Sequence, residues 1–368
     1  MPLYIGIMSG TSLDSIDVAL CEISTTTKLL AHCDHDFPKA LRTELIALCQ
    51  PGDNESERMG RADRELGAAY GDAVNALLKQ TGVAASQVKA IGCHGQTIRH
   101  RPATATRTAN TAFTLQIGDP NTLAARTGIT TVGDFRRRDI AEGGQGAPLA
   151  PAFHRAAFAS PTSDRAIVNI GGMANITLLP THGECSGFDT GPGNVLMDAW
   201  IRQHQGLEFD DAGRWAASGQ VISELLAQLL ALPYFQKQSG PRSTGREDFD
   251  AALLATLPGN NDAADVQATL LELSAQTIAA PLLKLDKPPS QLYVCGGGAY
   301  NTALMQRLET LLHPMIIAST GQLGIAPEWV EAMAFAWLAH RRLEGHSGNI
   351  PSVTGAAREV SLGAVYPA

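Results

Sequence analysis

The 368-residue sequence lacks several features that mark common classes of protein. No apolar run reaches the roughly 18 residues that a membrane-spanning helix needs, and the N-terminus has neither the charged start nor the apolar stretch of a secretory signal. A basic excess is also missing, since 28 Lys and Arg stand against 36 Asp and Glu. Nucleic-acid and anionic-lipid binding depend on clustered positive charge. We therefore expect a cytoplasmic protein that binds neither nucleic acid nor membrane.

Cysteine pairs and several well-known catalytic motifs are absent as well. The six cysteines are scattered, with no C-x-x-C and no spacing typical of a disulfide framework or a zinc site. Cys93 and Cys295 end apolar runs, where small buried thiols are common, which favours structural roles over nucleophilic ones. The motifs G-x-x-x-x-G-K-[ST], G-x-S-x-G and H-E-x-x-H do not occur, and no G-x-G-x-x-G follows a strand. P-loop, Rossmann, hydrolase and zincin interpretations therefore lose their usual support.

The sequence is rich in glycine, with 36 residues, and long enough for two domains of common size. An apolar run from Leu3, an alternating run over 16–23 and a third run over 29–37 predict a three-stranded meander. The same order restarts over 165–179, and its third strand ends at 187–191. Two halves with the same opening predict a duplicated fold.

The remaining pattern alternates helices and strands, and it places the boundary between the lobes in a charged, glycine-rich stretch. We expect an N-terminal lobe over residues 1–145 and a C-terminal lobe over 146–368. The tail 350–368 should pack back on the first lobe, and its part 353–366 should be extended or loop. The predicted helices cover residues 39–49, 55–80, 147–158, 219–230, 262–285 and 328–343, and further helices begin near residues 120, 194 and 301. Further strands are predicted at 88–94, 114–117, 129–132, 291–295 and 315–319.

Three glycine-rich turns, at 10–12, 171–175 and 296–299, each follow a predicted strand. Glycine lets backbone N–H groups approach anionic oxygens closely, so such turns suit phosphate. Tight strand connections would look the same in isolation. Two turns at equivalent places of duplicated halves, and a third beside them, favour phosphate binding. The candidate residues of the second and third turns are Gly171, Gly172, Asn175, Gly296, Gly297 and Gly298.

Acidic residues flank two of these segments. Asp14 is placed to bind Mg²⁺, directly or through water, beside a phosphate loop. Asp17 lies in an alternating strand and fits a solvent-facing residue equally well. Asp189 ends a strand, where it is placed either as a general base or as a turn-stabilising carboxylate. If Asp189 is not the base, Asp139 or a glutamate is the next candidate.

Several polar residues near the predicted crossing between the two lobes are candidates for binding the substrate. Only one or two of the adjacent arginines 136–138 can face a ligand, and Arg137 is the one we choose. His154, in an apolar helix, is more typical of a core histidine. The predicted substrate-binding residues are Gln96, Thr97, Arg137, Glu328 and Glu331.

Long motifs in fixed order resemble those of one family, the anhydro-N-acetylmuramic acid kinases of bacterial peptidoglycan recycling. The resemblance runs nearly from end to end. It rests on IMSGTSLD at 7–14, GCHGQTIRH at 92–100, DFRRRD at 134–139, GGQGAPL at 143–149, NIGG at 169–172, FDTGPGN at 188–194, STGRE at 243–247 and VCGGGA at 294–299.

This resemblance implies two actin/hexokinase-like (ribonuclease H-like) α/β lobes, each a mixed sheet flanked by helices, with the active site in the cleft between the lobes. It also implies a homodimeric kinase that converts 1,6-anhydro-N-acetylmuramic acid, ATP and water to N-acetylmuramic acid 6-phosphate and ADP, with Mg²⁺ as cofactor. Asp189 matches the base that activates the water. The segment 6–17 contains the family's ATP signature, which is Gly10, Thr11, Ser12, Leu13, Asp14, Ser15, Ile16 and Asp17.

One position departs from the family pattern, because Ser15 stands where glycine is usual. A serine in a left-handed turn there would alter nucleotide affinity. Two alternative functions remain at this point. A kinase of the same fold would act on another small acceptor, and a non-catalytic actin-like ATP-binding protein would keep the phosphate turns without needing a base at Asp189.

Overall fold

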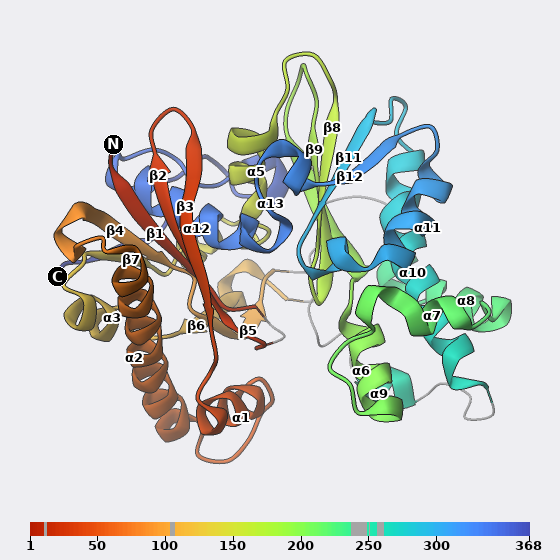
Figure 1. The fold of residues 1–368 in the computed structure, drawn as a ribbon, viewed down its shortest axis with the longest axis horizontal. Coiled ribbons are helices and arrows are strands. Elements are labelled where there is room, and N and C mark those ends of the chain that lie inside the picture. Colours follow the sequence, from red (N-terminus) through yellow and green to blue (C-terminus); the bar gives the residue numbers. More distant parts are fainter. Residues whose placement is uncertain (11–12, 104–106, 237–248, 250, 256–260) are drawn as a thin grey trace. The chain divides into compact units, whose positions relative to one another are not determined.

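The computed structural model describes residues 1–10, 13–103, 107–236, 249, 251–255 and 261–368 (Figure 1). Contacts divide the chain into two compact units, one of residues 1–157 with 329–368 and the other of residues 158–328. This division differs from the predicted boundary at 145 and 146, because the last long helix returns to the sheet of the first unit. No helix among the described residues has an apolar stretch of the length a bilayer requires.

Unit 1 is built on a six-stranded mixed sheet in the order β13-β7-β4-β1-β2-β3, with a separate two-stranded sheet, β5-β6. Its strands are β1 Leu3–Met8, β2 Ile16–Ile23, β3 Thr27–His35, β4 Val88–Cys93, β5 Gln96–Arg101, β6 Phe113–Ile117, β7 Thr131–Gly133 and β13 Ala364–Tyr366. Its helices are α1 Lys39–Leu48, α2 Glu55–Thr81, α3 Pro120–Thr127, α4 Arg137–Ala141, α5 Ala150–Phe158, α12 Val330–Leu343 and α13 Pro351–Thr354.

The two faces of the main sheet in unit 1 are covered by different helices. Ile5 and Ile7 of β1 are fully buried in a core shared with α1 and α2. On the other face, Gly6 and Gly92 lie directly under α12, and a Cβ on either residue would overlap a backbone carbonyl of that helix. Because only glycine allows this approach, these two positions seat α12 against β1 and β4.

The tail of the chain also belongs to unit 1. β13 pairs antiparallel with β7, with Val365 opposite Val132. Earlier in the tail, Asn349 Nδ2 and Thr354 Oγ1 donate hydrogen bonds of 2.8 and 2.7 Å to the buried carboxylate of Asp139. The segment 353–366, predicted as extended or loop, therefore contains the end of α13 and the edge strand β13.

Unit 2 is a five-stranded mixed sheet in the order β10-β9-β8-β11-β12. Its strands are β8 Arg165–Ile170, β9 Met173–Leu179, β10 Ser186–Pro192, β11 Gln291–Cys295 and β12 Ile316–Ser319. Its helices are α6 Val195–Gln205, α7 Arg214–Ser218, α8 Ser223–Leu230, α9 Ala251–Ala255, α10 Ala263–Leu283 and α11 Thr302–Leu312. Short 3₁₀ helices at Gly297–Tyr300 and Pro327–Trp329 follow β11 and precede α12.

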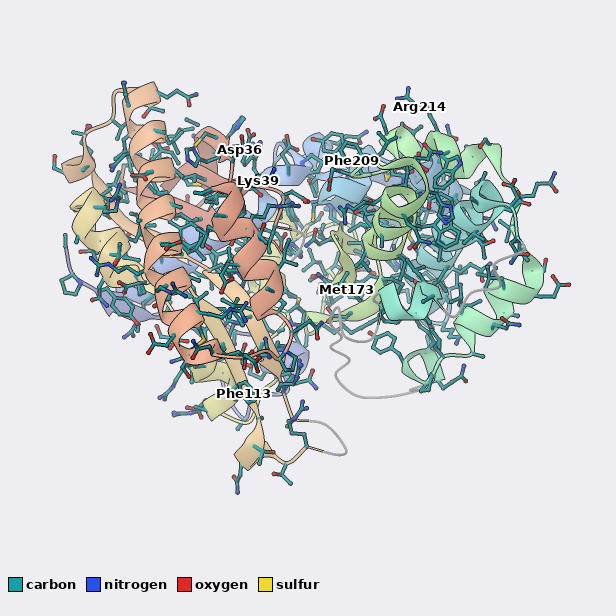
Figure 2. All side chains as sticks on the ribbon, turned by 90° about the horizontal axis from the view of Figure 1, so that it is seen from below. Asp36, Lys39, Phe113, Met173, Phe209 and Arg214 are labelled. Carbon is teal, nitrogen blue, oxygen red and sulfur yellow. The ribbon has the colours of Figure 1, made fainter. Side chains whose placement is uncertain are left out.

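Each unit thus opens with an antiparallel three-stranded meander whose first strand then pairs in parallel with a later strand. In unit 2, alternate residues of β8 and β9, including Val168 and Ile176, join a core with α6, α10 and α11. A mixed sheet flanked by helices, built twice on the same plan, confirms the predicted fold class. Figure 2 shows the side chains of both units and labels Met173, the first residue of β9.

Candidate active site

The first glycine turn joins β1 to β2 in unit 1. Leu13 has a positive φ of 57°, is fully buried, and its N–H donates to Gly10 O at 3.2 Å. Arg42 of α1 fixes the same turn, since its Nε donates to Leu13 O at 2.7 Å. Thr11 and Ser12 lie outside the described residues. The described part of the predicted phosphate loop is therefore held by a buried leucine and an arginine from the next helix.

Asp14 and Asp17 differ in their surroundings. Asp14 has an exposed carboxylate, 66% accessible, at 3.9 Å from Arg42, whereas Asp17 lies within β2 and accepts a 2.6 Å hydrogen bond from Ser15 Oγ. In the described chain, positive φ outside glycine occurs at Leu13, Asn54, Asp134 and Ala212. Ser15 therefore keeps an ordinary backbone, and its replacement of glycine costs no strain.

A second polar turn follows β4, the parallel neighbour of β1. His94 N–H donates to Ile7 O at 3.1 Å, which places this turn at the same sheet edge as the phosphate loop. Gln96 is 1% exposed, and its Oε1 has no hydrogen-bond partner among the described residues. Thr97 Oγ1 accepts from Gln116 Nε2 at 3.1 Å. Gln96 thus has an acceptor available for a bound ligand.

The three adjacent arginines have different partners. Arg136 donates from Nε and Nη2 to His94 Nε2 at 3.0 and 2.9 Å, and burial together with this guanidinium lowers the pKa of His94 well below its ordinary value. Arg138 pairs with Glu142 at 2.9 Å. Among the residues that the structure describes, Arg137 forms one longer ionic contact, 3.5 Å from Asp134, and 57% of its side chain is exposed. Arg136 is structural here, and Arg137 has the weakest attachment of the three.

Unit 2 places the other two glycine turns at one edge of its sheet. The first follows β8, where Gly193 N–H and Asn194 N–H donate to Gly172 O and Gly171 O at 2.9 and 2.8 Å. The second follows β11, the parallel neighbour of β8. Gly296 has φ +77°, and a Cβ there would overlap Asn169 Oδ1. Two backbone turns with close mutual packing therefore form one rim, as phosphate binding requires.

Glu328 lies beside this rim. Gly296 N–H donates to Pro327 O at 3.0 Å, and the Tyr300 hydroxyl donates to the Glu328 carboxylate. Burial and this carboxylate raise the pKa of Tyr300 to about 12. Glu331 lies in the first turn of α12 and belongs to unit 1. The two glutamates, close in sequence, are therefore held by different units.

Asp189 is one member of a row of polar side chains that crosses the sheet of unit 2. It pairs with Asn175 on β9, Asn175 pairs with Asn169 on β8, and Asn169 pairs with Cys295 on β11. The ladder shifts register between Asp189 and Gly191, a bulge of the kind that re-aims side chains beside active sites. Tyr234 Oη donates to the Asp189 backbone carbonyl at 2.6 Å.

The predicted residues thus fall into two sets, one in each unit. Unit 1 gathers the phosphate loop, the Gln96–Thr97 turn and Arg137, and unit 2 gathers Asp189 with the second and third turns. Asn169 was missed as an individual residue, although one asparagine near the end of the apolar run 165–170 was a visible signal. Among the described residues, no group of three or more His, Cys, Asp or Glu side chains is placed to hold a metal ion.

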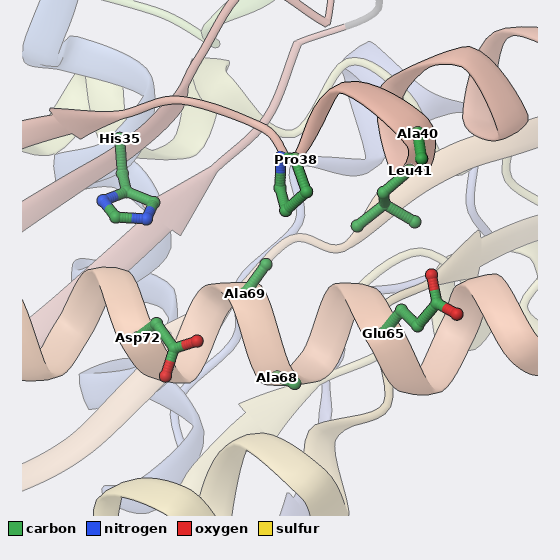
Figure 3. Close-up of a pocket in the computed structure, with 8 residues that line it drawn as sticks. All are labelled: His35, Pro38, Ala40, Leu41, Glu65, Ala68, Ala69 and Asp72. Atoms are coloured by element: carbon green, nitrogen blue, oxygen red, sulfur yellow. The ribbon is translucent and has the colours of Figure 1, made fainter.

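A surface groove of about 290 Å³ lies in unit 1 between α2 and the junction of β3 with α1 (Figure 3). It combines an apolar floor with acidic residues on α2. None of the predicted site residues lines it, so the groove is separate from both sets. Its lining residues are His35, Pro38, Ala40, Leu41, Glu65, Ala68, Ala69 and Asp72.

Comparisons with known proteins match the chain over its whole length. The family model described as anhydro-N-acetylmuramic acid kinase matches residues 2–368. Similar proteins carrying the same name come from Saccharophagus degradans, 53% identical over 99% of this chain and 98% of the relative, and from Shewanella amazonensis, 52% identical over 100% and 99%. A third, from Pseudomonas paraeruginosa, is 52% identical over the full length of both chains.

Proposed function

Because the chain belongs to the anhydro-N-acetylmuramic acid kinase family, we propose that it opens 1,6-anhydro-N-acetylmuramic acid with water and phosphorylates the released O6 from ATP. The products are N-acetylmuramic acid 6-phosphate and ADP. The observation that carries this proposal is the placement of the Asp189 carboxylate, 8% exposed, at the sheet edge that also bears two glycine turns. A base and a phosphate rim in one unit are what coupled hydrolysis and phosphoryl transfer need.

Asp189 acts as the general base in this proposal. It takes one proton from a water molecule whose oxygen bonds to the anomeric carbon C1. The C1–O6 bond breaks, and its electron pair goes to O6. The O6 oxygen then bonds to the γ-phosphorus of ATP while the bond from that phosphorus to the β–γ bridging oxygen breaks, releasing ADP. A positioned base typically contributes about 10²–10⁴-fold to such a step.

The phosphate contacts are assigned to backbone N–H groups. We assign them to the segment Gly10–Asp17 in unit 1 and to Gly172, Gly297 and Gly298 in unit 2. The N–H groups of Gly171 and Gly296 donate to Met173 O and Pro327 O, so these two glycines shape the turns. Asp14 fits a Mg²⁺ ligand, because its carboxylate is exposed and, within the described part of the chain, forms one long ionic contact. When bound, Mg²⁺ neutralises charge on the transferring phosphoryl group. Asp17 is less suited, since its carboxylate already accepts from Ser15.

The sugar contacts are assigned to Gln96, Thr97, Arg137, Glu328 and Glu331. Gln96 supports this assignment most directly, because its buried Oε1 has no partner among the described residues and would accept from a sugar hydroxyl or amide. Arg137 is exposed and weakly held, so it is available to the substrate carboxylate. We also propose that the enzyme is a cytoplasmic homodimer, which light scattering and cell fractionation test.

The central experiment is turnover of 1,6-anhydro-N-acetylmuramic acid with Mg-ATP in ¹⁸O-labelled water. We expect sugar-dependent ADP and one ¹⁸O in the anomeric hydroxyl at early times. ADP formed without that label would disprove coupled hydrolysis, and no sugar-dependent ADP would disprove the kinase assignment for this substrate.

The role of Asp189 has its own test. Asp189→Asn should lose at least about 10²-fold in kcat with little change in ATP binding. The matched control is Asp262→Asn at the N-terminus of α10, where asparagine caps a helix as well as aspartate does. Normal turnover in Asp189→Asn would assign the base to another carboxylate.

A further inference from the structure

The polar row of unit 2 places two asparagines beside the proposed base. Residues directly opposite each other on neighbouring strands have Cβ atoms about 4.5–5.5 Å apart and point to the same face. Asp189, Asn175 and Asn169 are opposite one another on β10, β9 and β8. Their sequence neighbours Ala174 and Ile176 point into the core, so the row occupies the other face of the sheet.

Both asparagines present an acceptor without a protein donor. Asn175 Oδ1 and Asn169 Oδ1 are shielded from solvent and have no hydrogen-bond partner among the described residues, and Asn169 is only 4% exposed. Leaving a buried acceptor without a donor is unfavourable. Asn175 Oδ1, on the residue directly opposite Asp189, therefore calls for a bound donor, and a water molecule is the smallest one that fits the proposed chemistry.

A water molecule that attacks carbon must have both of its hydrogens held. One hydrogen faces the base that removes it, and the other needs a second acceptor, so that a lone pair is directed at the carbon. We propose that Asn175 Oδ1 is this second acceptor and that Asn175 positions the attacking water together with Asp189. This inference rests on the proposed function.

The proton balance favours an amide over a second carboxylate at this position. Asp189 takes one proton, and the water oxygen bonds to C1 as the C1–O6 bond breaks. The second hydrogen stays on that oxygen and becomes the hydrogen of the anomeric hydroxyl, still bonded to Asn175 Oδ1. A neutral acceptor holds this hydrogen without removing it. A neutral amide also adds no charge beside Asp189, whereas a second carboxylate there would raise the pKa of its neighbour.

The first test uses the acidic limb of the pH profile of kcat, which reports ionisation of the base in the bound complex. Asn175→Asp adds a charge directly beside Asp189 and should move this limb upward by about one pH unit or more. The matched control is Asn169→Asp. It adds the same charge one strand further away, about 10 Å from Asp189 across two strand spacings, and should shift the limb much less. No shift in Asn175→Asp, or equal shifts in both variants, would overturn the inference.

The second test measures which nucleophile reaches C1 when methanol is added to the assay. In the unaltered enzyme, the attacking water is held by two acceptors and methanol competes poorly with it. The methyl glycoside phosphate, formed when methanol attacks C1, should therefore be a minor product. Asn175→Ala should lower kcat at least about tenfold, keep the KM for ATP within about twofold, and raise the methyl glycoside fraction several-fold. A kcat and a product ratio like those of the unaltered enzyme would refute the role of Asn175.

These outcomes are separate from failure of the proposed function. If the unaltered enzyme forms no sugar-dependent ADP, the proposed function itself is wrong. If it does, and both Asn175 variants behave like it, only the positioning role is wrong. Should Asn175→Ala fail to fold by circular dichroism, the nearly isosteric Asn175→Asp still decides the question through its pH profile.

Discussion

Replacing Gly296 by alanine should disrupt the third glycine turn and weaken ATP binding. Gly296 follows β11 with φ +77° and ψ 177°, a region that essentially only glycine adopts and that costs another residue about 1–3 kcal/mol. That Cβ would overlap Asn169 Oδ1 and lie 2.8 Å from Ile170 O. The Ile170 oxygen belongs to the end of a central strand and cannot move aside freely, so overpacking adds about 1–3 kcal/mol.

Two other glycines separate these contributions. Gly206 has φ +70° and ψ 13°, and a Cβ on it would have no heavy atom within 4 Å, so Gly206→Ala measures the cost of a left-handed backbone without steric overlap. A Cβ on Gly297 would meet only Asn194 Nδ2 at 3.7 Å, so Gly297→Ala controls for a methyl group in the turn itself. The loss of unfolding free energy should increase from Gly297→Ala to Gly206→Ala and reach about 2–6 kcal/mol in Gly296→Ala.

Urea unfolding measures these differences in the free energy of unfolding. Calorimetric titration with ATP measures how each substitution changes the affinity for ATP. Gly206→Ala should bind ATP normally, because Gly206 ends α6 outside the proposed site. Gly296→Ala should bind it at least about tenfold more weakly, which corresponds to about 1.4 kcal/mol. If Gly296→Ala were no less stable than Gly206→Ala, the argument from overlap with Asn169 and Ile170 would be wrong.

Three further predictions concern stability. Gly92→Ala should prevent α12 from packing, because its Cβ would overlap Phe335 O, and soluble yield should collapse. Burial lowers the pKa of His154 to about 3, so the unfolded state binds a proton at a higher pH than the folded state does. The free energy of unfolding should therefore fall below pH 6.5 by up to about 1.4 kcal/mol per pH unit. In urea unfolding, His154→Leu should show a weaker dependence of this free energy on pH. Arg307→Met should cost about 3 kcal/mol in urea unfolding by stranding the Glu272 carboxylate, and adding Glu272→Gln should recover part of it.

Local pattern predicted most elements of both units. The alternating run 16–23 is β2, and the predicted helix 55–80 is α2, which ends before Gly82 in the left-handed conformation. The predicted helix 219–230 begins later than expected, because α8 covers Ser223–Leu230 and Gly219 is in extended backbone. The short helix α7, Arg214–Ser218, was not predicted.

Long-range packing was harder to predict than local structure. The helix predicted over 328–343 was recognised, but its return to unit 1 depends on Gly6 and Gly92, more than 230 residues earlier. Asp189 and Asn175 were both chosen from sequence, yet their pairing follows from strand register, which a bulge alters at this point. Register depends on how whole strands pair, and single-residue patterns carry little information about it.

The surroundings of Asp139, the other aspartate considered as the base, make it less suited to that role than Asp189. Asp139 is fully buried, and its carboxylate accepts from Gly146 N–H at 2.8 Å in addition to Asn349 and Thr354. With three of its roughly four lone-pair sites already occupied by the protein, it has little capacity to accept a proton from a substrate water. Its hydrogen bonds instead fasten the glycine-rich segment after α4 to the tail. Asp189 therefore remains the stronger candidate, because it lies at a sheet edge opposite Asn175, whose Oδ1 has no donor among the residues that the structure describes.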